Sequence, residues 1–386
     1  MATTLPRLGR VTTDSTAGSS PTDSSPTDDS PTDSSRSDAA SPEPAPTDRP
    51  GSYEDRVLGC LLGTMAGDAY GLLYAAGDDP LTALDDPADL VVSDATHLTL
   101  YTVDGLVDAL AWANDGVAAD ETACLWLAYL RWLGRQGEHL PPSAPAPPAR
   151  WIDRQDDLLP VHEPDADTVR ALLSGEMGTR ARPLNPQAQG AGALMRSAPF
   201  GLVPRIPASM VERLTVDAAA LTHGSPAARS TAALFSGVIR SLAIEGLSLD
   251  EAVRVERVEE RHLAEDAGHD GTRAMTTGDT ASGRAADRTR TGDTTAAGTF
   301  EAALQAAREG VASSSSPREQ LAASLAHAAA AGRSDASPVV AASLAGAIVG
   351  ALRGTDALPS AYLSAPGLAD VVRSMATSLL AATTGA

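Results

Sequence analysis

The side chains of this sequence that could do chemistry gather in a few short acidic or glycine-rich stretches. Ser93 and Asp94 lie where a helix is expected to begin, and there a side-chain oxygen caps free backbone N–H groups while a carboxylate gains from the helix dipole. The loop Gly190-Ala191-Gly192 could bring backbone N–H groups close to a diphosphate. Arg196 follows shortly after and could either contact a phosphate or brace a carboxylate.

The first helix that must position these residues is predicted to begin near Tyr53. Its apolar residues recur at helical spacing: Val57, Leu58, Leu61, Leu62 and Met65. Gly59, Gly63 and Gly67 follow one another every four residues and therefore form one smooth stripe. Such a stripe costs stability when it faces water, but it lets a second helix approach closely. We therefore expect this helix to pack against another one.

The rest of the chain also favours helices. Alanine and leucine dominate the apolar residues, and no alternation of strands and helices is visible. Further helices are predicted from residue 93 or 94 and at residues 121–134, 207–221, 225–247, 249–263, 300–310, 318–331, 339–352 and 367–382. The sequence predicts a single compact all-α domain of about a dozen helices over residues 53–386.

Two segments lack the hydrophobic pattern of a folded element. Residues 1–52 are rich in Ser, Thr, Pro, Asp and Ala, and Ser-Pro-Thr-Asp recurs from residues 20, 25 and 30. We expect this tail to be disordered and to serve as a phosphorylated regulatory segment or as a solubilising spacer. Residues 267–299 are rich in Gly, Thr, Asp and Arg, and they are predicted to form a disordered surface insertion between two helices.

Composition excludes several classes of protein. The net charge of −21 repels phosphate backbones, so general nucleic-acid binding is not expected. Two cysteines, Cys60 and Cys124, supply neither a disulfide framework nor a zinc site, and both are predicted to be buried. No signal peptide and no long uncharged apolar run is apparent, so we expect a cytoplasmic protein without a membrane segment.

Five segments resemble the motifs of the ADP-ribosylglycohydrolase family, in the family's order. Residues 59–71 match Gly-x-x-x-Gly-x-x-x-Gly-Asp-Ala-x-Gly at every specified position, and residues 93–100 resemble Ser/Thr-Asp-Asp-Thr-x-x-Thr-Leu. The others are the glycine loop with Met-Arg-x-Ala-Pro at 190–201, the Thr-His helix start at 221–226 and the last glycine-containing helix and turn at 344–359. The chain is therefore identified as a member of that family.

The resemblance implies a helical cleft that holds two magnesium ions against the ribose of ADP-ribose, beside the scissile glycosidic bond. Hard divalent ions prefer oxygen ligands, and they would orient the sugar and activate water. On this sequence the family's metal positions correspond to Ser93 and Asp94, with Asp335 near the second acidic segment. The family's ligand-binding positions would be Gly190, Gly192 and Arg196.

The departures from the family pattern fall on its acidic positions. Ala95 replaces the second carboxylate of the first segment, and the second segment, counted back from Gly346, falls on residues 337–340, which contain no carboxylate. The family's usual acidic residue after the glycine helix corresponds to Ala75. Asp335 could take part only through a locally shifted backbone. A site built for four positive charges thus loses about three carboxylates, and we expect magnesium to bind weakly or not at all.

Three hypotheses follow for the function. The first is a catalytically impaired pseudoenzyme that binds ADP-ribose, an ADP-ribosylated protein or another partner. The second is an active metal-dependent hydrolase that removes ADP-ribose from protein side chains through a rearranged site with Ser93, Asp94 and Asp335. The third is a scaffold or regulatory protein that acts through its disordered segments.

Overall fold

Helices make up the regular structure of this chain. The computed structural model describes residues 51–161, 163–258, 294–331 and 335–384, and no strand occurs within these ranges. The α-helices are α1 (Tyr53–Ala76), α2 (Thr82–Asp85), α3 (Asp94–Asn114), α4 (Glu121–Arg135), α5 (Ala166–Leu173), α6 (Ala198–Gly201), α7 (Ala208–Ala220), α8 (Pro226–Ala243), α10 (Ala296–Ser313), α11 (Pro317–Ala329), α12 (Pro338–Arg353) and α13 (Leu368–Thr384). Residues 249–258 are also helical, and three short 3₁₀ turns complete the regular structure: η1 (Ile152–Arg154), η2 (Gly354–Ala357) and η3 (Ser360–Leu363). The all-α prediction is confirmed.

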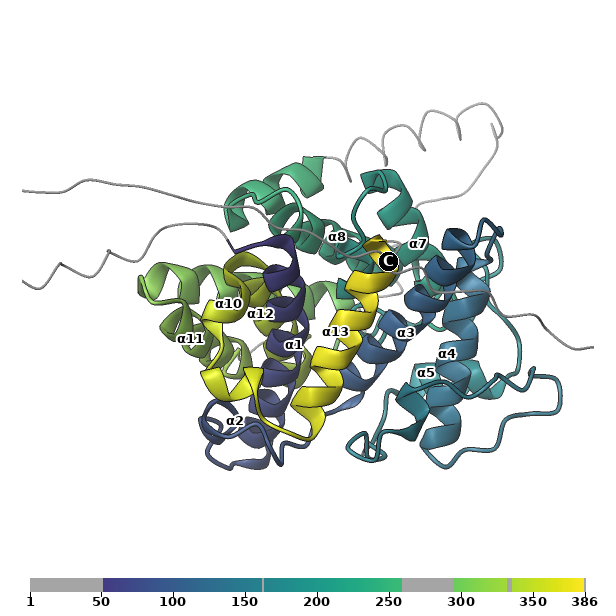
Figure 1. Cartoon of the computed structure of the whole chain (residues 1–386), viewed down its shortest axis with the longest axis horizontal. Helices are drawn as coiled ribbons and strands as arrows, with labels where there is room; N and C mark the ends of the chain where they lie inside the picture. Colours follow the sequence, from purple (N-terminus) through teal and green to yellow (C-terminus); the bar gives the residue numbers. More distant parts are fainter. Residues whose placement is uncertain (1–50, 162, 259–293, 332–334, 385–386) are drawn as a thin grey trace, which may run out of the picture. The chain divides into compact units, whose positions relative to one another are not determined.

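The centre of the fold is the close pair formed by α1 and α12 (Figure 1). A Cβ atom built on Gly63 would come closer than 3.0 Å to the backbone carbonyl of Gly346, and a Cβ on Gly350 would come as close to the carbonyl of Gly59. The two helices therefore touch backbone to backbone along reciprocal glycine stripes. This contact confirms the close helix approach that the glycine spacing predicted.

The other helices surround this pair. α10 and α11 pack on each other and on α12, whereas α13 lies against both α1 and α3 (Figure 1). On the far side of α3, contacts pass from α3 to α4, from α4 to α7 and from α7 to α8. The buried apolar side chains form one continuous cluster that includes residues from nearly all of these helices. This arrangement holds the second half of α1, the start of α3 and the start of α5 near one another, where the candidate site lies.

By length and composition alone, two helices are apolar enough to cross a membrane. They are α1 and the stretch Pro338–Ala357, and 78% and 72% of their most apolar windows are buried inside the structure. Because these two helices form the central pair, their apolar character is accounted for by packing within the fold.

The start of α10 corrects one prediction. Residues 296–299 belong to this helix rather than to the insertion predicted at 267–299. Residues 267–293 of that insertion lie outside the described part of the chain, and so do residues 1–50 of the predicted tail. The composition of this run, rich in Gly, Thr, Asp and Arg, extends the predicted insertion over the first turn of α10. The structure shows why Gly298 is needed there, since its Cβ would lie 2.6 Å from the side-chain carbon Cγ of Asp335.

Candidate functional site

Asp68 of α1 positions the start of α3. Its Oδ2 atom accepts hydrogen bonds from the backbone N–H of Ser93 (3.0 Å), the backbone N–H of Thr96 (3.0 Å) and the Thr96 hydroxyl (2.6 Å). Burial raises the pKa of this fully enclosed carboxyl group, and the hydrogen bonds oppose the shift. Asp68 therefore braces the glycine helix against α3.

Ser93 and Asp94 begin α3 in different roles. The Ser93 hydroxyl accepts the backbone N–H of Ala95 (3.1 Å) and thus caps the helix. The Oδ2 atom of Asp94 accepts the backbone N–H of Asp165 at 2.6 Å. Burial raises the pKa of Asp94, and the neighbouring carboxylates of Asp165 and Asp68 add to the shift, whereas the hydrogen bond from Asp165 works against it; the resulting pKa is about 7. Asp94 is thus turned toward α5 and is satisfied by a protein donor.

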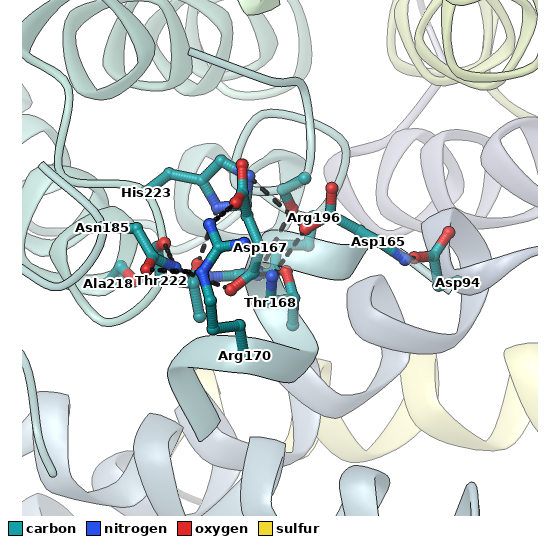
Figure 2. Close-up of polar contacts among 11 residues, drawn as sticks. Asp94, Asp165, Asp167, Thr168, Arg170, Asn185, Arg196, Ala218, Thr222 and His223 are labelled. Carbon is teal, nitrogen blue, oxygen red and sulfur yellow. Dashed lines mark hydrogen bonds and ion pairs between the residues drawn. The ribbon is translucent and has the colours of Figure 1, made fainter. Parts of the chain in front are cut away.

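Asp165 links Asp94 to the start of the Thr-His element, as Figure 2 shows. Its Oδ2 atom accepts the backbone N–H of Thr168 (2.7 Å), which caps α5, and the same atom lies 3.4 Å from Nε2 of His223. His223 is fully buried, its Nδ1 is 2.9 Å from the Thr222 hydroxyl, and loss of solvent lowers its pKa to about 4. At neutral pH, His223 is therefore an uncharged part of the core.

Arg196 is a brace within the protein. Its guanidinium donates to the Thr222 hydroxyl (2.7 Å) and the Gly192 carbonyl (3.2 Å), with longer bonds to Thr168 and Ala218, and it stacks over the ring of Tyr129 at 4.4 Å. The side chain is 1% exposed. Of the two roles considered for Arg196, these contacts fit a structural brace rather than a phosphate ligand. The groups that it braces are hydroxyls, carbonyls and an aromatic ring, whereas a carboxylate was expected.

The structure brings only some of the predicted site residues together. Asp94, Gly192 and Arg196 meet around the start of α5, and Gly192 has no room for a side chain because its Cβ would lie 2.5 Å from Asp165 Oδ2. Gly190 is half-buried and less crowded, with His223 Nε2 3.7 Å from its Cβ position.

Two further predicted positions lie elsewhere. Ala75 is exposed in the last turn of α1. Asp335 contacts the start of α10, where its backbone carbonyl accepts the N–H of Thr295 (2.8 Å). Neither residue joins the group around Asp94.

The sequence reading missed Asp165. A signal was present, since an aspartate followed three residues later by Thr168 at the start of a short apolar-periodic stretch is a typical helix N-cap pattern. The helix that it caps, α5, has only eight residues and follows a long proline-rich loop, so its periodicity covers barely two turns. The contact with Asp94, 71 residues away in sequence, is a tertiary one that local patterns do not reveal.

The donor set does not fit the pair of magnesium ions that the family resemblance implies. Ala95 places a fully buried methyl group where the second carboxylate would be, and Val339 and Val340 occupy the first turn of α12. Within the described ranges, no group of three or more His, Cys, Asp or Glu side chains is placed to hold a metal ion. Asp94, the acidic residue retained in the first segment, already accepts a backbone N–H. Mg²⁺ in proteins is usually held by one or two carboxylates together with waters and substrate phosphates, and a pair of ions needs the further carboxylates that Ala95 and residues 337–340 lack.

The raised pKa of Asp94 predicts a specific pH dependence of stability. Folding raises this pKa from 3.8 to about 7, so the stabilisation is present at low pH and is lost as the pH rises through about 7. In Asp94→Asn the ionisation is removed, and the variant should gain on the parent by at most about 4 kcal/mol between pH 4 and pH 8. Urea unfolding of both proteins across this range measures the difference between them. The lowered pKa of His223 stabilises the fold as the pH rises, but this contribution is the same in both proteins and cancels in the difference. A pH-independent difference would contradict the prediction.

Comparisons with known proteins agree with this fold. No curated protein matches the chain. A solved structure described as an ADP-ribosylglycohydrolase-related protein complex is similar to it, with a TM-score of 0.50 and 21% sequence identity, covering 86% of this chain and 99% of the other. At this identity the likeness shows the fold alone. The family model for ADP-ribosylglycohydrolase matches residues 49–386, which include all the helices described above. The chain therefore belongs to the ADP-ribosylglycohydrolase family.

Proposed function

We propose that this chain is a non-hydrolysing member of its family, which recognises ADP-ribose or an ADP-ribosylated protein without cleaving it. The observation that carries the proposal is Ala95, a fully buried methyl group beside Asp94 at the start of α3. The family is generally metal-dependent. Cleavage of the glycosidic bond would need ions that orient the ribose and activate water, and the residues around Asp94 do not attract them.

The recognition half of the proposal is supported by the elements that remain intact. The central α1–α12 pair, the loop before α6 and the Thr222-His223 turn all keep the family's order and are rigidly braced by Asp68 and Arg196. A site that loses its charge but keeps its frame can still bind a polar ligand through backbone donors. Gly190 is half-buried and its Cβ position makes only an ordinary contact with His223 Nε2 at 3.7 Å, so it is the point at which such donors would be accessible.

Two measurements test this function together. We expect no release of ADP-ribose from peptides ADP-ribosylated on arginine or serine, with Mg²⁺ or Mn²⁺ present, because no donor set retains the ions. We also expect ADP-ribose to raise the melting temperature of the full chain equally with and without Mg²⁺, because a ligand that binds only the folded state stabilises it. AMP and ribose 5-phosphate serve as matched control ligands.

Each alternative hypothesis predicts a different result. Magnesium-dependent release of ADP-ribose that Asp94→Ala abolishes would contradict the proposal and would support an active hydrolase with a rearranged site. If ADP-ribose leaves the melting temperature unchanged, the recognition half fails. A scaffold that acts through the segments outside the described ranges would instead lose its partner when residues 1–50 and 267–293 are deleted, a deletion that retains the cap Ser52 and the whole of α10.

A further inference from the structure

We propose that a chain of contacts within the protein, Asp94–Asp165–His223, holds the site together in the position where the family resemblance places divalent ions. The inference rests on the proposed function in one respect, which is that the site works without metal. It adds that the site is closed by its own residues and is not an empty cation site awaiting an ion.

The contact chain joins three elements that are far apart in sequence. Asp94 is the first residue of α3, Asp165 caps α5, and His223 lies in the turn before α8. The Asp165 backbone N–H donates to Asp94 Oδ2 at 2.6 Å, and Asp165 Oδ2 lies 3.4 Å from His223 Nε2 (Figure 2). Asp94 is 8% exposed and His223 is fully buried, whereas the side chain of Asp165 between them is 24% exposed, so water reaches only the middle of the contact chain.

The start of α5 offers Asp94 a backbone donor that the fold holds in place. The first backbone N–H groups of a helix carry partial positive charge, and the N–H of Asp165 immediately precedes the eight residues of α5. A short hydrogen bond from such a group to a carboxylate is among the stronger ones in proteins. Asp94 therefore has a partner that is fixed by the fold.

Arg196 closes the same neighbourhood from another side. Its guanidinium bonds the Gly192 carbonyl, the Thr168 hydroxyl of α5 and the Thr222 hydroxyl next to His223. Two of the elements joined by the contact chain, α5 and the turn before α8, are thus joined a second time through a buried cation that belongs to the protein. Asp94, Asp165 and Thr222 each have a protein partner, so the fold holds this group together without divalent ions.

The test is thermal unfolding of the ligand-free full chain in EDTA, in Mg²⁺ and in Mn²⁺. We expect the parent protein to melt at the same temperature in all three. Asp94→Ala removes the acceptor for the Asp165 N–H and should lower the melting temperature by about 3–6 °C in each condition. Asp94→Asn keeps a side-chain oxygen that accepts this bond and should melt at or above the parent temperature at pH 7. Asp120→Ala, which removes the exposed cap of α4, is the matched control and should cost less.

Hydrogen exchange followed by mass spectrometry locates the effect. In Asp94→Ala, exchange should rise at least threefold in peptides that cover α5 and the Thr222-His223 turn, while peptides from α11 stay unchanged. The inference would be overturned if Mg²⁺ or Mn²⁺ raised the melting temperature of the parent and Asp94→Asn lost this rise. Unchanged hydrogen exchange at α5 in Asp94→Ala would overturn it as well. If Asp94→Ala does not fold, the metal response of the parent and of Asp94→Asn decides. Because ADP-ribose is absent throughout, failure here is distinguishable from failure of the proposed function.

Discussion

Replacing Gly63 with alanine is expected to lower the free energy of unfolding by about 3 kcal/mol or more. The added methyl group would come closer than 3.0 Å to the Gly346 carbonyl, which is backbone and cannot rotate away. α1 and α12 would have to separate, and the contacts on both sides of the crossing would loosen with them. The higher helix propensity of alanine returns only about 1 kcal/mol, so the steric term decides the sign.

Urea unfolding of the full chain measures this effect, with Gly134→Ala as the matched control. Gly134 lies inside α4, and nothing occupies the space within 4 Å of its Cβ position. The same substitution there should therefore stabilise the protein by up to about 1 kcal/mol. If Gly63→Ala proves as stable as Gly134→Ala, the backbone contact between α1 and α12 is not what holds the centre of the fold.

The second large effect is expected for Arg196→Met, which should cost about 3–5 kcal/mol, because each buried acceptor left without a donor costs about 1–3 kcal/mol. Methionine has a similar length but no donors, so the buried acceptors on Gly192 and Thr222 would lose their partner and the ring of Tyr129 its stacked cation. Arg196→Lys should recover only part of the loss, because one ammonium group cannot reproduce the planar fork of the guanidinium.

Arg180→Met provides the comparison for Arg196. The Arg180 side chain is 52% exposed and its bond to Asp217 is 3.0 Å, so solvent screens the pair and the substitution should cost no more than about 1 kcal/mol. Guanidinium unfolding midpoints of the three variants give the ranking. Equal midpoints for Arg196→Met and Arg180→Met would show that Arg196 does not brace the site and would reopen its interpretation as a ligand-binding residue.

The centre of the fold could be predicted from sequence because its signals are local. The four-residue spacing of Gly59, Gly63 and Gly67 specifies a smooth helix face, and such a face has few uses other than close packing against another helix. Helical periodicity likewise placed most of the long helices within a few residues of their ends. It failed at α10, where Gly298 serves a tertiary contact with Asp335 that local propensity cannot show.

The candidate site was less predictable because its decisive contacts are between distant residues. The absence of a carboxylate at Ala95 is visible in the sequence, but the partner that replaces an ion at Asp94 is a backbone N–H, which every residue except proline carries. No residue type marks such a donor. Arg196 illustrates the same limit, since its sequence context fits both a phosphate ligand and a brace, and only its burial separates the two.

The α1–α12 pair also has a consequence for biosynthesis. The 261 residues between Ala76 and Pro338 must be translated before the partner of α1 begins to emerge, which takes roughly 13–52 s at about 5–20 residues per second. During that time α1 lacks its main partner, and contacts between segments so far apart in sequence form slowly. We therefore expect the glycine-lined face of α1 to need chaperone protection until α12 has emerged.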